Sequence, residues 1–444
     1  MIKKRLVSSF FEEEYKQQAA NNNYQKIASY VDGLKPTARK VIHTVIKNNL
    51  TSWTKVEVLA NKTAGETEYL GGSSNISGVI TTISKGYVTS NNIPMLDTMG
   101  NFGQRLDNKP GEPRYIKVRK GNILEDYFSK VDNNILIEQE FEETIIEPRF
   151  FVPNLPFILL NGSMGALGTG HAQEILPRDI NDIKLYINNY INDIPNSPLK
   201  PYWNNFRGII KQGETYNKWI TEGLYKVNKR QITVYELPVG YSLLSYTKKL
   251  DILVDKKVIR SYIDESNTKT DKFMFIIKVD TKFKLEHENI LDKLKLTSKF
   301  SENYTVMDEN NSIKVFDNSS DLLDSYIKIK LKYLGLRKEY IINKIKDDLA
   351  IMVSKYTFIN LIINNKLIIN KRKKNEIILE LEELPDIIKI NNSYDYLLNT
   401  PIYNLTQEKI DNIYDNIKLK KEELLNVTNK SIEVMWLEDI KKIG

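Results

Sequence analysis

The strongest constraint on the fold comes from the last third of the chain, where the apolar pattern is almost wholly helical. From residue 336 onward, apolar side chains recur three to five positions apart, at Leu336, Tyr340, Ile345, Leu349, Met352, Tyr356 and Ile359. This spacing places them on one stripe of a long helix. A second helical pattern over residues 406–428 can pair with it antiparallel, with a compact cap between the two. We therefore expect residues 326–444 to form a long antiparallel coiled-coil arm with a small helical tip; a plain helical C-terminal domain is the alternative.

Length and residue usage narrow the class of protein. A chain of 444 residues is too long for one ordinary core, so we expect about two to four domains. Cysteine is absent, and the only histidines are His43, His171 and His287, far apart in sequence. Disulfides, thiolate zinc sites and cysteine nucleophiles are thereby excluded, and a histidine metal site or a Ser-His-Asp triad is disfavoured. Any chemistry must come from Tyr, Lys, Arg, Asp or Glu.

Hydropathy and charge are typical of a soluble protein. No run of about 18 apolar residues is present, so we expect no membrane span. The start of the chain is basic and then acidic without an apolar segment, which argues against a secretory signal. A cytoplasmic, reducing location follows from these features and from the missing cysteines. The net charge of +7 is a mild indication of a polyanionic partner, although the Lys-, Asn- and Ile-rich composition of an AT-rich genome explains it equally well.

Residues 25–185, after an N-terminal arm over residues 1–24, alternate short helices with a strand. The first helix follows Pro36, and its apolar stripe is Val41, Ile42, Val45 and Ile46. A second helix is expected near residues 56–65. A third is expected where Ile76, Val79, Ile80 and Ile83 recur, with Ser73 or Ser74 as its N-cap. Followed by the strand-like "PRYIKVRK", these helices predict a winged-helix pattern whose last helix suits a DNA groove; a generic helical subdomain is equally compatible.

Two further segments complete the outline. The glycine-rich "GALGTG" follows an apolar strand but lacks GxxxxGK[ST] and opens no clear helix, so it is not a Walker loop. Residues 186–325 mix strands, at "ITVYELP", "KFMFIIKV" and "NSIKVF", with amphipathic helices such as "SLLSYTKKLDILVD". They predict a separate α/β domain, so the whole chain is expected to be an α+β multidomain protein.

The segment "GEPRYIKVRK" raises the question of chemistry, because Tyr115 directly follows Arg114 and three cations come after it. A tyrosine has an ordinary pKa near 10 and is a poor nucleophile at neutral pH. Local sequence alone therefore favours a half-buried strand tyrosine.

A series of colinear motifs reverses this preference. In chain order they are "YVDGLKPTARKVI", "EYLGGSSNISGVI", "IPMLDTMGNFGQR", "EPRYIKVR", "LLNGSMGALGTGHAQEILPRDI", "PYWNNFRGIIK", "ITVYELPVGYSLLSYTKKL", "KLKLTSKF", "KLIINKRKKNEII" and "YDYLLNTPIYNLT". Together they resemble the DNA breakage-reunion part of type IIA DNA topoisomerases, in gyrase A-like proteins, the eukaryotic topoisomerase II version and the separate medium subunit of tailed-phage topoisomerases. The resemblance runs from about residue 25 to the C-terminus. It implies a winged-helix cleavage domain at 25–185, a tower domain at 186–325, and a coiled-coil arm with a dimerising C-gate at 326–444.

The resemblance also implies roles for individual residues. Tyr115 stands where the family's nucleophile stands and would form a 5′-phosphotyrosyl link. Arg114 would stabilise charge on the transferring phosphate, and Arg39 would reach the scissile phosphate. Leu167, in "ALGTG", replaces the isoleucine of "GIGTG" that wedges between base pairs. Further DNA contacts are assigned to Lys35, Lys40, Lys117, Arg119, Lys295 and Lys299, and Lys120 is expected to be a solvated phosphate contact beside them.

Departures from the family pattern are part of the prediction. Leu70 and Gly71 stand where the family has a histidine pair, so that contact to the scissile region is lost or supplied elsewhere. No TOPRIM acidic set and no gyrase-type ATPase segment stand in this sequence, so no metal site is expected in this chain. The Mg²⁺ would be held by a partner TOPRIM domain and the ATP by a partner ATPase subunit. The absence of a β-pinwheel predicts relaxation of supercoils rather than their introduction.

The resulting expectation is the cleavage and religation subunit of an ATP-dependent type IIA topoisomerase. It would act as a homodimer on double-stranded DNA within a hetero-oligomer, with a phage as the inferred source. One alternative is a non-catalytic DNA-binding or architectural protein that retains the fold, which the missing histidines favour. A topoisomerase VI type enzyme is the other alternative, and the lack of TOPRIM carboxylates after the winged helix argues against it.

Overall fold

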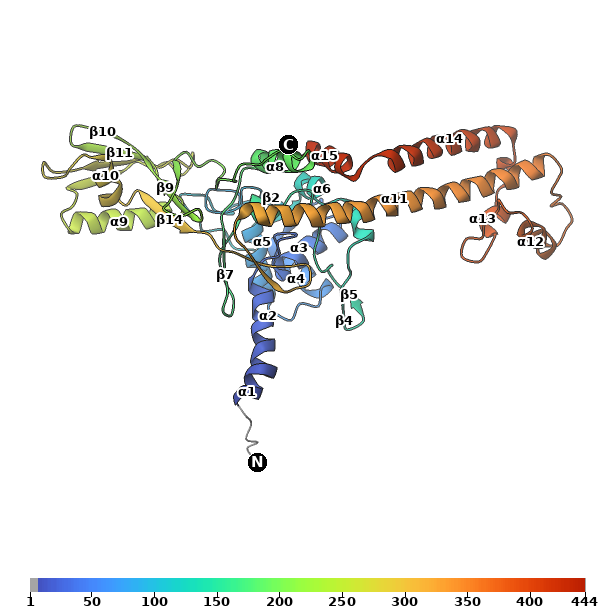
Figure 1. Ribbon diagram of the computed structural model, residues 1–444, viewed down its shortest axis with the longest axis horizontal. Coiled ribbons are helices and arrows are strands. Elements are labelled where there is room, and N and C mark those ends of the chain that lie inside the picture. The colour runs from blue at the N-terminus through green and yellow to red at the C-terminus, as the bar shows by residue number, and fades with distance from the viewer. Residues whose placement is uncertain (1–6, 444) are drawn as a thin grey trace, which may run out of the picture. The chain divides into compact units, whose positions relative to one another are not determined.

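A computed structural model describes residues 7–443 (Figure 1). The chain forms two compact units. The first contains the described residues up to Lys330 together with those from Asp439 onward, and the second is Leu331–Glu438. Both helices and strands build the first unit, so the predicted α+β class is confirmed. The first six residues of the expected N-terminal arm, and Gly444, lie outside the described residues.

The N-terminal segment is one continuous helical rod followed by a buried strap. The rod consists of α1 (Val7–Ser9), the π-helical η1 (Phe10–Tyr15) and α2 (Lys16–Lys26). It ends because Ile27 adopts an extended conformation. From Ile27 to Leu34 every residue except Gly33 is buried. We call residues 27–34 the strap.

Three helices and a small sheet follow the strap. The helices are α3 (Pro36–Lys47), α4 (Val56–Glu66) and α5 (Ser73–Ser84). The strands β1 (Thr54–Lys55), β2 (Leu96–Met99) and β3 (Lys117–Lys120) form an antiparallel sheet in the order β1-β3-β2. All three predicted helices exist, but the predicted serine N-cap is wrong. Gly72 is the N-cap residue of α5, with no side-chain capping bond, because Ser73 is already helical.

The next segment, residues 122–191, surrounds a hairpin. Its elements are α6 (Asn122–Tyr127), η2 (Lys130–Asn134), β4 (Glu140–Phe141), β5 (Thr144–Ile145), α7 (Phe157–Leu160), β6 (Ser163–Leu167), β7 (Ala172–Ile175) and α8 (Ile180–Ile191). The glycine-rich "GALGTG" lies at the end of the antiparallel β6–β7 hairpin and opens no helix, as expected. The aromatic rings of Tyr127, Phe128, Phe151 and Phe157 pack together in the same segment.

The α/β segment contains three sheets. The first has the order β10-β11-β13-β12, the second β14-β9-β8, and the third is the pair β15-β16. Their bounds are β8 (Ile209–Gln212), β9 (Lys218–Glu222), β10 (Leu224–Asn228), β11 (Gln231–Glu236), β12 (Ser261–Asp264), β13 (Phe275–Lys278), β14 (Thr297–Ser301), β15 (Tyr304–Met307) and β16 (Ile313–Phe316). The helices α9 (Leu243–Asp255) and α10 (His287–Lys293) share a core with the four-stranded sheet. The three strands and the helix predicted here are therefore confirmed.

The second unit is a helix pair with a small tip. Helix α11 (Ser319–Ile363) begins in the first unit, and its second half runs beside α14 (Gln407–Asn429) (Figure 1). Ile345 and Leu349 of α11 pack on Ile417 of α14. The antiparallel direction follows because Lys338 Nζ donates to Thr428 O at 2.8 Å. Thus the long helix and its partner are confirmed, although Leu336 is 39% exposed and stands outside the stripe.

The tip has a core of its own. It comprises α12 (Lys374–Glu382), α13 (Asp395–Leu398) and η3 (Ile402–Asn404), and α15 (Ile432–Lys442) follows α14. Leu381 and Leu397 are fully buried there against Phe358 of α11. Ser354 Oγ lies 3.1 Å from Asp386 O and accepts from Ile388 N at 3.1 Å, which fixes the tip segment to α11. Among residues 7–443, no helix is both long and apolar enough to cross a membrane.

Candidate active site and nucleic-acid interface

Tyr115 stands on an anchored turn immediately before β3. Its backbone N–H donates to Glu112 O at 2.9 Å, and Val56 N–H donates to Ile116 O at 3.1 Å. Ile116 is 2% exposed, whereas Tyr115 is 71% exposed. The half-buried strand tyrosine suggested by local sequence is therefore wrong. The chain enters β3 only at Lys117, so a buried neighbour fixes the turn while the phenol faces outward.

Arg114 is next to the Tyr115 ring. Its guanidinium carbon lies 5.2 Å from the ring centroid, which is a cation–π contact. Both side chains are exposed. The structure therefore presents a phenol and a permanent cation together at one surface point, which is a suitable arrangement for meeting a phosphodiester.

Arg39 has a different environment from the one its predicted role suggests. It is 2% exposed. Its Nε and Nη2 donate to Asp32 at 2.7 and 3.1 Å, and Nη2 also donates to Leu34 O at 3.2 Å. Burial disfavours the charge of Arg39, but Asp32 outweighs that effect and raises the pKa of Arg39. Nη1 is buried and has no hydrogen-bond partner within residues 7–443, so it is the atom left over for another acceptor.

Lys35 and Lys40 flank the start of α3 and differ in their availability. Burial, with Lys26 nearby, lowers the pKa of Lys35. No ion-pair partner of Lys35 is found within the described part of the chain. Lys40 Nζ, in contrast, pairs with Glu147 at 2.9 Å and donates to Thr67 O at 2.8 Å. Its side chain is only 13% exposed, so its ammonium group is not free for a phosphate in this structure.

The cations of β3 alternate in direction along the strand. Lys117 is half-buried. Arg119 pairs with Asp97 at 3.0 Å and lies over the Trp53 ring at 4.5 Å. Lys120 is 9% exposed, and its Nζ donates to Asn49 Oδ1 at 2.8 Å and Glu125 Oε1 at 2.6 Å. The expectation that Lys120 is a solvated phosphate contact is wrong, because strand alternation turns it to the same face as the fully buried Val118.

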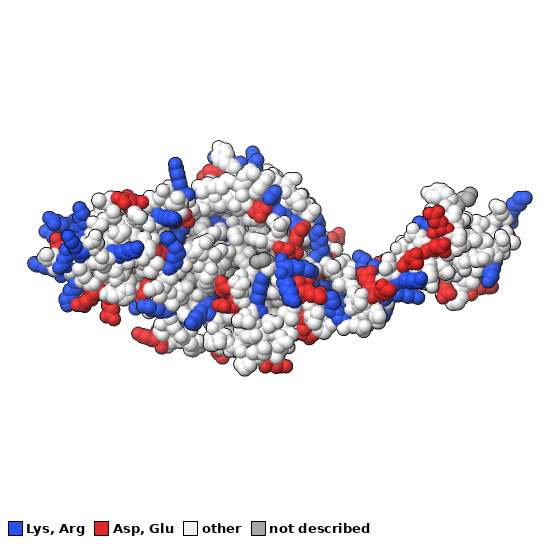
Figure 2. Space-filling model, turned by 90° about the horizontal axis from the view of Figure 1, so that it is seen from above, with Lys and Arg blue, Asp and Glu red and all other residues white. Residues whose placement is uncertain are grey.

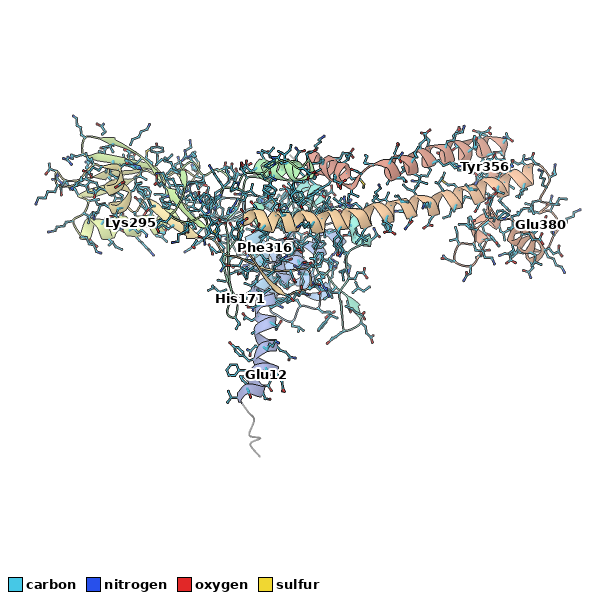
Figure 3. The ribbon with its side chains drawn as sticks, in the orientation of Figure 1. Glu12, His171, Lys295, Phe316, Tyr356 and Glu380 are labelled. Carbon is cyan, nitrogen blue, oxygen red and sulfur yellow. The ribbon has the colours of Figure 1, made fainter. Side chains whose placement is uncertain are left out.

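Leu167 is the exposed apolar residue at the end of the β6–β7 hairpin. It is 71% exposed, although its neighbour Ala166 is 3% exposed. The turn closes through Gly168 N–H, which donates to His171 O at 2.8 Å. Figure 3 labels His171 on this turn, beside the end of α2. An exposed leucine at the end of a held hairpin is suited to insertion into an apolar site.

Lys295 and Lys299 lie in the α/β segment. Lys295 follows α10 and pairs with Asp292 at 3.2 Å, and Lys299 is exposed on β14. They belong to a strongly basic stretch. Residues 201–300 contain 19 Lys and Arg against 12 Asp and Glu, which accounts for the whole net charge of +7. Figure 2 shows Lys and Arg gathered over the end of the first unit formed by β10, β11, α9 and α10.

The positions of the missing histidine pair carry no substitute imidazole. Leu70 is 88% exposed, and at Gly71 an added Cβ would meet the Tyr69 ring at 2.7 Å. His43 is half-buried on α3, where burial lowers its pKa to about 4. His287 bonds the Tyr225 hydroxyl in the α/β segment at 2.7 Å.

Metal binding by this chain depends on the donor chemistry of the described residues. No group of three or more His, Asp or Glu side chains that could hold a metal ion occurs within residues 7–443. The Tyr115 turn carries a phenol, a guanidinium and one carboxylate, that of Glu112, and a single carboxylate does not form an Mg²⁺ site. A catalytic Mg²⁺ therefore does not fit the residues of this chain alone.

The fold and the exposed Arg-Tyr turn point to one class of protein, the DNA breakage-reunion proteins. The family profile that describes the A subunits of DNA gyrase and topoisomerase IV matches residues 26–441. The chain belongs to this family.

Relatives and solved structures agree with this assignment. The mitochondrial DNA topoisomerase 2 of Dictyostelium discoideum is 30% identical over 95% of this chain and 34% of its own length. DNA topoisomerase 2 of Plasmodium falciparum is 31% identical over 94% and 33%. The crystal structure of the Plasmodium falciparum topoisomerase II DNA-binding, cleavage and re-ligation domain has a TM-score of 0.87 and 31% identity, over 98% of this chain and 63% of that one. This chain spans about a third of the length of these curated relatives.

Some residues of the site were not identified from the sequence. Asp32, which holds Arg39, stands in the quoted "DGLKP" and could have been suspected from it. Trp53 under Arg119 gave no local signal. The Leu167 hairpin is bonded to Asn23 of α2 through Thr169 and to Ala28 of the strap through Gln173. These bonds join residues about 145 positions apart, and no sequence pattern indicated them.

Proposed function

We propose that this chain is the DNA cleavage and religation subunit of a type IIA topoisomerase. The observation that carries the proposal is the exposed Arg114-Tyr115 pair on a rigidly anchored turn, in a chain of this family. The phenol is accessible, while the backbone on both sides of it is held by hydrogen bonds. Such preorganisation is what an in-line attack on phosphorus requires.

In the proposed reaction, Tyr115 Oη attacks a backbone phosphorus of double-stranded DNA. The new O–P bond makes a 5′-phosphotyrosyl link, the bond from phosphorus to the 3′ oxygen breaks, and the phenol proton is lost as the 3′ oxygen gains one. Religation is the reverse. A phenolate is a better leaving group than an alkoxide, so both directions remain accessible.

Two arginines would act on the phosphate. Arg114 would move from the Tyr115 ring to the phosphate oxygens as charge develops there. Arg39 would contribute its unpaired Nη1 only if a rearrangement exposed that buried atom, while Asp32 keeps the rest of the guanidinium fixed. Mg²⁺ held by a partner TOPRIM domain would supply further charge neutralisation at this phosphate.

The DNA would follow a track over the first unit. Leu167 would wedge between base pairs and bend the duplex. Lys35, Lys117 and Arg119 would hold phosphates near Tyr115. Lys295, Lys299 and the basic stretch at residues 201–300 would hold the flanking duplex. Lys40 would join them only if its pair with Glu147 opened.

The proposed domains are those implied by the resemblance: a winged-helix cleavage domain at 25–185, a tower at 186–325, and a coiled-coil arm with a C-gate at 326–444. The order β1-β3-β2 beside three helices supports the first, and the separate cores of the arm and tip support the last. Two copies would cut opposite strands. A partner ATPase and TOPRIM subunit would drive strand passage, relaxing and decatenating DNA.

The test is trapping of the covalent intermediate. Supercoiled DNA is mixed with this chain, Mg²⁺, ATP and the candidate partner subunit. The protein in the mixture is then denatured with detergent. We expect protein covalently attached to 5′ ends, and none with Tyr115→Phe. Tyr216→Phe, at a tyrosine that is 61% exposed on the α/β segment, is the matched control and should retain the adduct. An adduct that persists in Tyr115→Phe would exclude Tyr115 as the nucleophile.

A non-catalytic DNA-binding protein is the second candidate. Leu70 and Gly71, which provide no imidazole, favour it. A non-catalytic protein would bind and bend DNA without forming a covalent adduct with any partner tried, whereas the enzyme would bend DNA and also form the adduct.

A further inference from the structure

The Leu167 hairpin is held by a side chain with every hydrogen-bonding position used. Gln173 of β7 is 1% exposed. Its Oε1 accepts from Ala28 N at 3.0 Å and Ser163 Oγ at 2.6 Å, and its Nε2 donates to Ala28 O at 3.2 Å and Thr305 O at 2.8 Å. One amide thus joins both hairpin strands to the strap and to β15. A buried amide with all four of its bonds made fixes one geometry.

The end of the hairpin rests on α2. Asn23, 7% exposed, donates from Nδ2 to Thr169 O at 3.2 Å. A Cβ built on Gly168, the residue after Leu167, would stand 2.2 Å from Asn23 Oδ1. Any larger residue at this point would therefore collide with the Asn23 side chain and force it to shift. Ala166, before Leu167, packs on Ile27 at the start of the strap.

The same strap leads to Arg39. Tyr24 lies between the two sites, because it packs with Ala166 and Ile27 and is close enough to Arg39 for the two side chains to interact. Five positions after Ile27, Asp32 takes the Arg39 guanidinium. The backbone between them is fixed to β15, since Met307 N donates to Ala28 O and Tyr30 N to Met307 O, each at 3.1 Å.

We propose that Asn23 and Gln173 are positioning residues that hold the Leu167 hairpin rigid against the strap, so that Leu167 can bend DNA. This inference rests on the proposed function, because Leu167 is taken as the wedge. Separating stacked base pairs requires a side chain that does not yield. Leu167 itself is exposed and makes little contact, so the stiffness must come from the residues behind it.

Bending is measured by energy transfer between dyes on the two ends of a duplex of about 40 base pairs, short relative to the persistence length of DNA. The full chain is used at saturating concentration, and affinity is measured separately. We expect Asn23→Ala to lower the ratio of bent to unbent complexes roughly threefold to tenfold, the range expected for one lost hydrogen bond with its packing. Asn196→Ala, which removes a comparable bond from Nδ2 to Tyr186 O at 3.1 Å, is the matched control and should not change the ratio.

A double-variant cycle separates positioning from general destabilisation. If Asn23 acts through the wedge, Asn23→Ala has no further effect on bending in a Leu167→Ala background. An equal effect in both backgrounds would mean that Asn23 only supports the fold, and the inference would be wrong. Gln173→Glu, which sets a carboxylate against Ala28 O and Thr305 O, should act in the same direction as Asn23→Ala.

A compensating pair keeps the test decisive if one variant folds poorly. Gly168→Ala should reduce bending through its collision with Asn23, and adding Asn23→Ala should restore bending to the level of Asn23→Ala alone. Failure of this rescue in folded proteins would overturn the inference, as would wild-type protein that binds the duplex without bending it. Adduct formation is a separate readout. Its absence would count against the proposed function while leaving the wedge result intact.

Discussion

Replacing Asp32 by asparagine should strongly destabilise the first unit, because it leaves the Arg39 charge buried without its counter-ion. The Asp32 side chain is 0% exposed and that of Arg39 is 3% exposed. The carboxylate accepts from Arg39 twice and also from Leu34 N at 3.0 Å and Phe151 N at 3.1 Å. Removing one partner of such a pair costs about 3–5 kcal/mol. An asparagine retains one acceptor, so we expect about 3 kcal/mol.

Hydrogen exchange suits this measurement, because global unfolding of a chain with two units need not be two-state. The amides of Val41 and Ile42 in α3 report opening of the region around Arg39. Asp97→Asn is the matched control. Its pair with Arg119 is slightly longer, at 3.0 Å against 2.7 Å, but the side chains are 38% and 41% exposed, so the loss should be below about 1 kcal/mol.

The double variant Asp32→Asn with Arg39→Met tests the stated cause. Removing the buried charge as well should recover part of the lost stability. A loss for Asp32→Asn no larger than that for Asp97→Asn, or no recovery in the double variant, would show that an unpaired buried charge is not the cause of the lost stability.

Burial lowers the pKa of His43 to about 4, so below pH 6.5 the unfolded chain takes up a proton before the folded chain does. The free energy of unfolding should therefore fall as the pH drops from about 6.5 to 4. His43→Gln should flatten this part of a plot of urea midpoint against pH, relative to wild type. Gly33→Ala places a Cβ 2.5 Å from Ile158 N at a φ of +69° and should cost about 2 kcal/mol or more in thermal unfolding; a wild-type melting temperature would contradict this. Ser354→Ala removes the acceptor of Ile388 N–H and should lower the local free energy of opening by about 1–3 kcal/mol. Hydrogen exchange at the Ile388 amide should therefore be faster, while exchange at the amides of α3 stays unchanged. Lys120→Met should leave the salt dependence of DNA binding unaltered, because Lys120 is turned inward. Lys299→Met should reduce the slope of log affinity against log salt concentration by about one.

The elements with strong periodicity were predictable from sequence. The stripe over residues 336–359 identified α11, and the second pattern identified α14, because long amphipathic helices keep their period over many turns. The start of α11 was less accessible. It begins at Ser319, since Leu322 and Leu323 continue the helix into the core of the first unit, and no break separates that part from the rest.

The candidate site was only partly predictable. The colinear motifs led to the predictions for Tyr115, Arg114 and Leu167. All three side chains are exposed, as the predicted roles require, and the roles stay predictions. Burial of charged groups was not foreseen, because it depends on partners that are distant in sequence. Lys40 meets Glu147 over a separation of 107 residues. The burial of Lys120 could have been predicted from strand alternation, because Lys120 lies two positions after the apolar Val118. The cluster of cations around Lys120 suggested a solvent-exposed side chain instead.

The register of β3 also determines where this chain can change its length. Val118 is paired with Thr54 on one side and with Thr98 on the other, and Tyr115 stands three positions before it. Inserting one residue between Tyr115 and Lys117 would keep the sheet and rotate the phenol away, or keep the phenol and exchange the buried and exposed faces of the strand. Residues 107–110, in the loop before the turn, are all exposed and pair with no strand, so no register is set there. Insertions and deletions should therefore be tolerated upstream of Tyr115 and rejected immediately downstream of it.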